Sequence, residues 1–168
     1  FGRIAQQVAR TAHRGFGMRI LYSSRRRASP EIEAETGATF HPEVDAMLPE
    51  ADFVSLHCPG GPETFHLIDA RRLGLMKPSA FLINTARGPV VDEAALTAAL
   101  KTRRIAGAGL DVYEAEPRVT PGLLELENVV LLPHLGSATE QSRTAMGMKV
   151  ADNLDAFFDG GAPPDRVS

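Results

Sequence analysis

The sequence contains very little cysteine: Cys58 is the single one, and tryptophan is absent. One cysteine cannot form an internal disulfide, and Cys58 lacks the partner residues that a zinc site would need. These absences exclude a disulfide-stabilised scaffold. They are consistent with a reducing compartment, so we expect a cytoplasmic protein.

Long apolar runs and an excess of charge of one sign are also missing. The longest apolar runs, such as residues 80–83 and 129–132, are far shorter than the roughly 20 residues of a membrane span. No charged-then-apolar signal segment opens the chain. The formal net charge is -3, with both signs scattered along the sequence, so neither nucleic acid nor a membrane is an expected partner.

The composition that remains is typical of a single globular domain, since 43% of the 168 residues are hydrophobic and 23% are charged. We predict that residues 1–159 form this domain. Residues 160–168 begin with Gly-Gly-Ala-Pro-Pro and are predicted to be a linker leading toward a separate substrate domain. The chain opens with a helical pattern and no initiator methionine, so we expect a first strand to precede Phe1.

Short apolar runs alternate with helical patterns along the chain. The predicted strands are residues 18–22, 38–40, 52–57, 80–84, 105–112 and 128–132. The predicted helices are an initial one with Ile4, Val8 and Ala12 on its apolar face, then residues 68–76, 93–100 with Asp92 as N-cap, and 138–158. Continuous apolar strands that alternate with helices indicate an α/β fold with a doubly wound parallel sheet.

In such sheets ligands bind at the carboxyl ends of the strands, so the loops there are the candidates for function. The first is the turn before the first helix, where Gly2 would let the backbone approach a pyrophosphate and Ala5 would allow close helix packing. It has the form of the second half of a Gly-x-Gly-x-x-Gly/Ala dinucleotide motif. An ordinary turn before a helix is the alternative.

The second candidate loop, residues 23–27, reads Ser-Ser-Arg-Arg-Arg. An acidic residue near this offset from the glycine turn would hold the ribose 2'-hydroxyl of NAD, whereas hydroxyl and guanidinium groups suit the 2'-phosphate of NADP. Because the loop has no acid, Ser24 and Arg25 predict a preference for NADP over NAD. The alternative is a solvated run of surface arginines.

Two further loops carry candidate catalytic groups. Arg87 follows a fully apolar strand and has the planar fork that suits a carboxylate, although a structural ion pair is an equal alternative. His134 follows another buried strand and could supply the proton that reduction of a keto acid requires, with Glu116 as its orienting partner. A histidine in such a position is more often structural, and it is the combination with Arg87 and Glu116 that favours catalysis.

Three motifs on successive loops resemble the D-isomer-specific 2-hydroxyacid dehydrogenases, and the likeness covers essentially the whole chain. They are residues 84–88 (NTARG), residues 109–117 (GLDVYEAEP) and residues 133–139 (PHLGSAT). The 29-residue spacing between Arg87 and Glu116 is similar to that of the family. The Ser-Arg pair after the second strand is similar to the glyoxylate/hydroxypyruvate reductase branch.

The resemblance implies a mechanism and a cofactor site. Arg87 would hold the substrate carboxylate, His134 would donate the proton during reduction, and Glu116 would stabilise the imidazolium. The implied cofactor-binding residues run from the pyrophosphate contacts, through the adenosine ribose and the cofactor edge, to the nicotinamide end: Gly2, Arg3, Ile4, Ser24, Arg25, Cys58, Pro59, Thr85, Asp111 and Gly136. Cys58 could equally be a small buried packing residue.

Two departures from the family pattern qualify this picture. Gly60 and Gly61 stand where the family usually has a Leu-Thr pair, so this loop lacks the side chains that the family has there. The substrate domain of the family is also outside this sequence, so the 168 residues alone are expected to be inactive.

The function predicted from the sequence is hydride transfer between NAD(P)H and a small 2-keto or 2-hydroxy acid, most simply reduction of glyoxylate or hydroxypyruvate. A nucleotide-sensing, partner-binding module of the corepressor type is the alternative. The full-length protein is expected to be a homodimer, with the helix over residues 138–158 either packing internally or contributing to the interface. The other histidines, His13, His41, His57 and His66, are expected to be structural or exposed.

Overall fold

The computed structural model describes residues 1–166 and divides them between two compact units, which are treated separately. The first unit is Phe1–Pro133, and the second begins at His134. The predicted boundary between residues 159 and 160 stays a prediction.

The first unit alternates strands with helices, as the sequence predicts. Its strands are β1 (Ile20–Tyr22), β2 (Ala38–Phe40), β3 (Phe53–Leu56), β4 (Phe81–Asn84), β5 (Gly107–Leu110) and β6 (Val129–Leu131). Its α-helices are α1 (Arg3–Phe16), α2 (Pro30–Thr36), α3 (Val44–Met47), α4 (Ala70–Leu75), α5 (Glu93–Lys101) and α6 (Pro121–Leu124). Three short 3-10 turns complete it: η1 (Leu48–Glu50), η2 (Pro62–Thr64) and η3 (Gly88–Val90).

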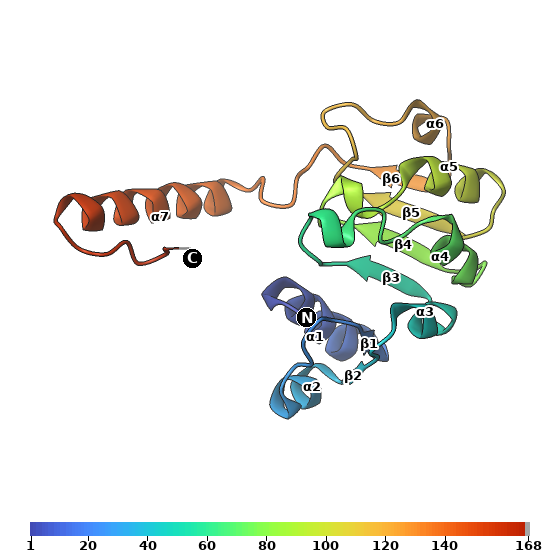
Figure 1. Cartoon of the computed structure of the whole chain (residues 1–168), viewed down its shortest axis with the longest axis horizontal. Helices are drawn as coiled ribbons and strands as arrows, with labels where there is room; N and C mark the ends of the chain where they lie inside the picture. The colour runs from blue at the N-terminus through green and yellow to red at the C-terminus, as the bar shows by residue number, and fades with distance from the viewer. Residues whose placement is uncertain (167–168) are drawn as a thin grey trace. The chain divides into compact units, whose positions relative to one another are not determined.

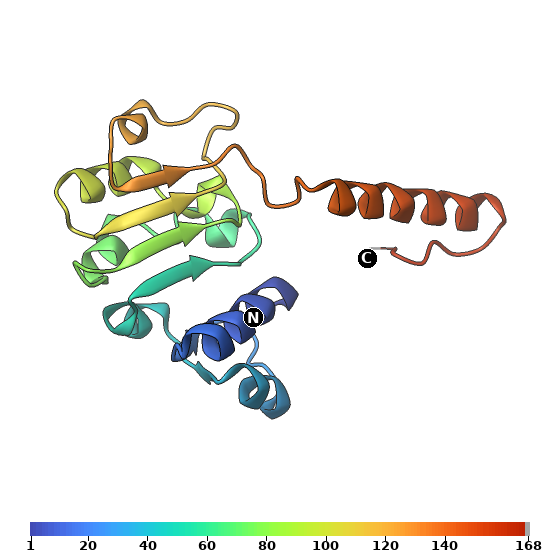
Figure 2. The ribbon, with the colours of Figure 1, turned by 180° about the vertical axis from the view of Figure 1, so that it is seen from behind.

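All strand pairs are parallel, which confirms the predicted parallel α/β class. β3, β4, β5 and β6 form a four-stranded sheet in chain order, whereas β1 and β2 form a separate two-stranded sheet. Figures 1 and 2 show α4 and α5 side by side over one face of the larger sheet. Within residues 1–166 no ladder joins β1 to β3, so the parallel strands of the first unit form two sheets.

The core lies between the larger sheet and α4 and α5. Leu82 of β4 and Leu96 of α5 are completely buried, and Leu110 of β5 is nearly so. Burying an aliphatic side chain of this size stabilises a fold by about 1.5–3 kcal/mol relative to leaving it exposed. Alternate residues along β3 and β4 point away from this core, which leaves Phe53 and Phe81 stacked and exposed on the other face of the sheet.

The apolar face of α1 differs from the predicted one. Ala5 and Ala9 are buried, whereas Ile4 and Val8 are 72% and 43% exposed. The four-residue spacing of Ile4 and Val8 predicts that these larger side chains are buried, but the alanines are buried in their place. Burial of Ala5 agrees with the close approach predicted for it.

Helix ends follow the expected capping chemistry where the sequence signals it. The carboxylate of Asp92 accepts a hydrogen bond from the amide of Ala95 at 2.9 Å, which confirms Asp92 as the N-cap of α5. The helices α2, α3 and α6 were not predicted. They contain four to seven residues each, too few to show an apolar periodicity.

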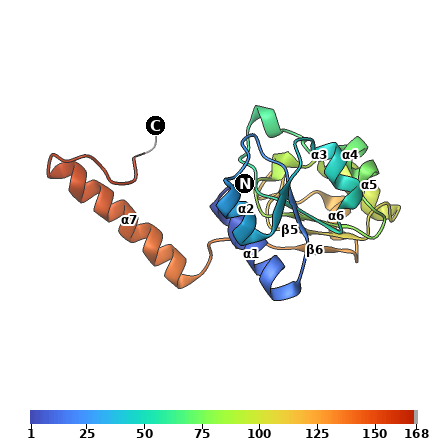
Figure 3. The same ribbon diagram turned by 90° about the horizontal axis from the view of Figure 1, so that it is seen from below.

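The second unit consists mainly of α7 (Glu140–Phe158), which Figure 3 shows as one unbroken helix. None of its residues is buried, and it exposes Met146, Val150, Leu154 and Phe157 along one side. Of the helices described within residues 1–166, none combines the length and the hydropathy that crossing a bilayer would need. The role of α7 in packing or in a homodimer stays a prediction.

A polar cluster joins the end of β1 to α2. The carboxylate of Glu33 accepts hydrogen bonds from the Tyr22 hydroxyl at 2.7 Å and from two nitrogens of Arg27 at 2.8 and 2.9 Å. Arg27 and then Tyr22 lower the pKa of Glu33 from an ordinary value of 4.5 to about 2. The ionised form of Glu33 therefore holds the loop after β1 against α2.

This cluster predicts a pH dependence of stability. Because the pKa of Glu33 is lower in the folded chain, its stabilising contribution is complete above pH 4.5 and is lost as the pH falls from about 4.5 to about 2. We expect Glu33→Gln to lower the melting temperature near neutral pH, with the difference from wild type shrinking across that window. Thermal unfolding at a series of pH values tests this.

The exposed carboxylate of Glu43 provides the matched control, since Glu43→Gln removes the same charge at the start of α3. A wild type and a Glu33→Gln variant whose melting temperatures differ by the same amount at every pH would contradict the assignment.

Candidate active site

The start of α1 has the features of an anion site. The backbone carbonyl of Gly2 accepts from the amide of Gln6 at 3.0 Å, and the first turn contains no acidic residue. Arg3 and Ile4 in this turn are exposed, and a side chain at Gly2 would meet no atom within 4 Å. A helix N-terminus with open backbone and no competing carboxylate suits a pyrophosphate.

The loop after β1 lies beside this turn. The hydroxyl of Ser24 accepts a hydrogen bond from the amino group of Phe1 at 2.6 Å. Arg25 is 79% exposed and forms an exposed ion pair with Glu63, with 3.3 Å between the nitrogen and the oxygen. Arg27 is paired with Glu33, so it is not part of a freely solvated run of arginines, and the cofactor role of Ser24 and Arg25 stays a prediction.

The loop after β3 carries Cys58 and Pro59. Burial raises the pKa of the Cys58 thiol, so the side chain is a neutral thiol near pH 7. Burial also lowers the pKa of His57. The hydroxyl of Thr64 donates to the carbonyl of Pro59 at 2.7 Å and fixes the turn. The cofactor contacts implied for Cys58 and Pro59 stay predictions.

The loop after β4 presents Arg87, and a buried asparagine organises it. Asn84 is 1% exposed; its amide nitrogen donates to the carbonyl of Arg87 at 3.0 Å, and its oxygen accepts from the amide of Ala86 at 3.1 Å. Thr85 and Arg87 are exposed on this turn. Asn84 is not among the predicted site residues, although an amide side chain that ends an apolar strand is a signal for a local turn.

Two glycines set the space around Arg87. A side chain at Gly88 would lie 1.9 Å from the backbone carbonyl of Tyr113, so the loops after β4 and β5 are in direct contact there. A side chain at Gly60 would lie 3.0 Å from Cγ of Arg87. The departure from the family pattern at Gly60 therefore falls next to the predicted substrate-binding arginine.

The loop after β5 carries Asp111 and Glu116. Asp111 is 4% exposed, and its amide donates to the carbonyl of Asn84 at 2.9 Å. Glu116 is exposed, and its carboxylate accepts from the amide of Tyr113 at 3.0 Å. The structure thus brings the loops of Arg87, Asp111 and Glu116 together at the carboxyl edge of the sheet.

His134 and Gly136 belong to the second unit. His134 is exposed, and its backbone is in the left-handed region with a φ of 57°. The pairing of His134 with Glu116 and the place of Gly136 by the cofactor stay predictions.

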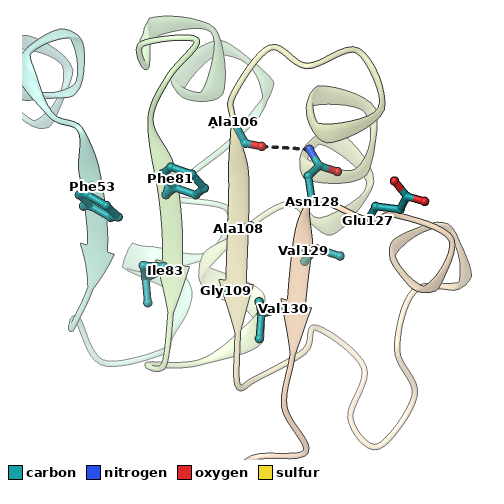
Figure 4. Close-up of a pocket in the computed structure, with 10 residues that line it drawn as sticks. All are labelled: Phe53, Phe81, Ile83, Ala106, Ala108, Gly109, Glu127, Asn128, Val129 and Val130. Carbon is teal, nitrogen blue, oxygen red and sulfur yellow. Dashed lines mark hydrogen bonds between the residues drawn. The ribbon is translucent and has the colours of Figure 1, made fainter.

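A pocket of about 460 Å³ lies elsewhere, over the face of the sheet opposite α4 and α5 (Figure 4). Phe53, Phe81, Ile83 and Val130 line it, and Asn128 bonds to the carbonyl of Ala106 at its rim. Ala106 and Asn128 precede β5 and β6, so this pocket extends toward the amino ends of the strands. It contains none of the predicted site residues and is not the candidate site.

Comparison with known proteins identifies the family to which the chain belongs. Residues 1–136 match the family model described as D-isomer specific 2-hydroxyacid dehydrogenase, NAD binding domain. A glyoxylate reductase of Thermococcus onnurineus is 55% identical over 168 residues, which are all of this chain and 49% of that protein. Glyoxylate/hydroxypyruvate reductase B of Enterobacter agglomerans is 49% identical over 168 residues and is covered to 51%. The chain therefore spans about half the length of these relatives.

Solved structures give the same result. The NADPH-dependent glyoxylate/hydroxypyruvate reductase of Sinorhizobium meliloti, in complex with NADP and malonate, superimposes with a TM-score of 0.92 at 41% identity. That comparison covers 99% of this chain and 50% of the other. The chain belongs to the D-isomer-specific 2-hydroxyacid dehydrogenases and carries the NAD-binding domain of that family.

Proposed function

We propose that the full-length protein carrying this segment reduces glyoxylate, hydroxypyruvate or a closely related 2-keto acid with a nicotinamide cofactor. The observation that carries the proposal is the placement of Arg87. A buried Asn84 fixes its turn, and the loop that bears Glu116 lies directly against it. The sequence similarity to glyoxylate reductases supports this choice of substrate class.

Arg87 is proposed to hold the substrate carboxylate. Its guanidinium is exposed at the carboxyl edge and can form two parallel charge-assisted hydrogen bonds to a carboxylate. Such a contact fixes the orientation of the neighbouring carbonyl. A 2-keto acid carries its carboxylate one bond from the reacting carbon, so one arginine positions both groups.

His134 is proposed to be the general acid. Reduction leaves negative charge on the C2 oxygen, and an imidazolium supplies the proton near neutral pH. Glu116 is proposed to stabilise that imidazolium and orient the ring. In the reverse direction, His134 accepts the proton from the hydroxyl group.

The turn at Gly2 and the loop of Ser24 and Arg25 are proposed to hold the dinucleotide. The acid-free helix start fits the pyrophosphate, and the exposed Arg25 fits a 2'-phosphate. When bound, the cofactor supplies the hydride for C2 of the keto acid. We propose NADP as the preferred form, with NAD as the alternative.

Substitution of the two proposed catalytic groups should have different kinetic effects. Arg87→Ala should raise the KM for glyoxylate about tenfold to hundredfold, because a charge-assisted hydrogen bond contributes about 1.5–3 kcal/mol. His134→Ala should lower kcat about 10²- to 10⁴-fold, because it removes the proton donor. Steady-state kinetics of the full-length protein measures both.

Arg14→Ala is the matched control, since Arg14 is an exposed arginine at the far end of α1. If an active full-length protein keeps its kinetic constants in both Arg87→Ala and His134→Ala, the site assignment is wrong. Tight dinucleotide binding without keto-acid turnover would instead favour the partner-binding alternative.

Cofactor choice gives a separate prediction. The kcat/KM of the wild type should be higher with NADPH than with NADH. Ser24→Asp should reverse the preference, since a carboxylate there repels the 2'-phosphate and accepts from a 2'-hydroxyl. Arg25→Ala should lower the NADPH-to-NADH ratio about tenfold, by loss of a charge-assisted contact.

Arg27→Ala serves as the comparison, because it removes the same charge from the same loop but acts by releasing the loop from Glu33. An equal loss of NADPH preference in Arg25→Ala and Arg27→Ala would argue against a specific role for Arg25.

A further inference from the structure

His66 lies in an unusual backbone conformation in the loop after β3. Its φ is 48°, in the left-handed region that non-glycine residues seldom adopt. Its amide donates to the carbonyl of Pro89 at 2.8 Å, and its ring stacks on Phe65 with the centroids 3.9 Å apart. Such a conformation persists where surrounding contacts hold it.

The side chain of His66 reaches the loop after β5. Its Nε2 lies 2.8 Å from a carboxylate oxygen of Glu114, and its Nδ1 lies 3.9 Å from the carboxylate of Asp92. The three side chains are 29–32% exposed. Glu114 is 48 residues away in sequence, so this contact joins two loops that the chain does not connect directly.

Glu114 is itself tied to the start of α5. Its amide donates to the carboxylate of Glu93 at 2.5 Å, and Glu93 is only 3% exposed. The other carboxylate oxygen of Glu93 accepts from the hydroxyl of Thr120. These bonds fix the backbone position of Glu114, so its carboxylate stays within hydrogen-bond distance of His66.

His66 forms a backbone hydrogen bond to Pro89 and a side-chain hydrogen bond to Glu114, and these two residues lie in the two loops that carry the proposed catalytic groups. Pro89 is two residues after Arg87, and Glu114 is two residues before Glu116. Gly88 between them lies against the backbone of Tyr113 and Glu114. One histidine thus contacts the loop of the proposed carboxylate-binding arginine and the loop of the proposed partner of the proton donor.

Stability alone gives a weak reason for this arrangement. The three side chains are partly exposed, and water screens the attraction between such groups, so their contacts contribute little to the free energy of unfolding. A directional contact does fix the relative position of two loops. A misplacement of about 1 Å at reacting groups can lower a rate by about 10²-fold.

We infer that His66 is a positioning residue that clamps the Arg87 loop to the Glu116 loop through Glu114. The inference rests on the proposed function for its kinetic consequence, although the clamp itself is a property of the structure. His66 does not touch the reacting atoms in this account. It acts by keeping the carboxylate-binding and acid-orienting groups in register.

The kinetic test compares His66→Ala with His66→Gln in the full-length protein. His66→Ala should raise the KM for glyoxylate about tenfold or more, with a change of less than about twofold in the Kd of NADPH. His66→Gln should recover most of the loss, because its amide nitrogen can still donate to Glu114. The double variant of His66→Ala with Glu114→Ala should be about as impaired as His66→Ala alone.

His13→Ala is the matched control, since His13 lies at the far end of α1 and its ring contacts the carbonyl of Met18. If His66→Ala weakens the binding of NADPH as much as that of glyoxylate and also lowers the melting temperature, and His66→Gln restores none of these, the role of His66 is merely structural and the inference is overturned. Unchanged kinetics in an active protein would overturn it too.

Amide hydrogen exchange tests the contact between the two loops without requiring turnover. His66→Ala should increase exchange at least threefold in peptides covering residues 87–93 and 113–118, with little change in the peptides of α1. No change in those peptides would overturn the clamp even where glyoxylate reduction is confirmed. If the wild type does not turn over keto acids but His66→Ala still increases exchange in those peptides, the proposed function is refuted and the clamp is retained.

Discussion

The close contact between the loops after β4 and β5 is the constraint on which the candidate site depends. At Gly88 the backbone of one loop lies so near Tyr113 that a single added carbon would collide with its carbonyl group. Only glycine permits this approach. Because Arg87 precedes this glycine and Glu116 follows Tyr113 by three residues, the contact fixes the distance between the two functional loops.

The sheet supplies the frame for that contact. Adjacent parallel strands end at the same edge, so the loops after β4 and β5 emerge as neighbours. The amide of Asp111 extends the ladder to the carbonyl of Asn84, and the side chain of Asn84 then turns the chain toward Arg87. The buried side chain of Asn84 thus links the paired strands to the turn that carries Arg87.

Much of this could be predicted from the sequence, because apolar runs and helix caps are local signals. The strands, the Asp92 cap and the loop positions of Arg87 and Glu116 follow from such patterns. The glycine turn before α1 predicts close packing at Ala5, but burial of Ala9 in place of Val8 could not be predicted, because a helix pattern ranks side chains by size and hydrophobicity, whereas the packed face consists of small ones. The bond between His66 and Glu114 joins residues 48 positions apart, and no periodic pattern records such a contact.

We propose that the full-length protein uses this domain for hydride transfer to a 2-keto acid. The most direct test supplies the full-length protein with glyoxylate and reduced cofactor carrying deuterium at the transferable C4 position, and locates the label by mass spectrometry. The account predicts one deuterium on C2 of glycolate for each cofactor oxidised. Cofactor that binds but keeps its deuterium, with no labelled 2-hydroxy acid formed, would contradict it.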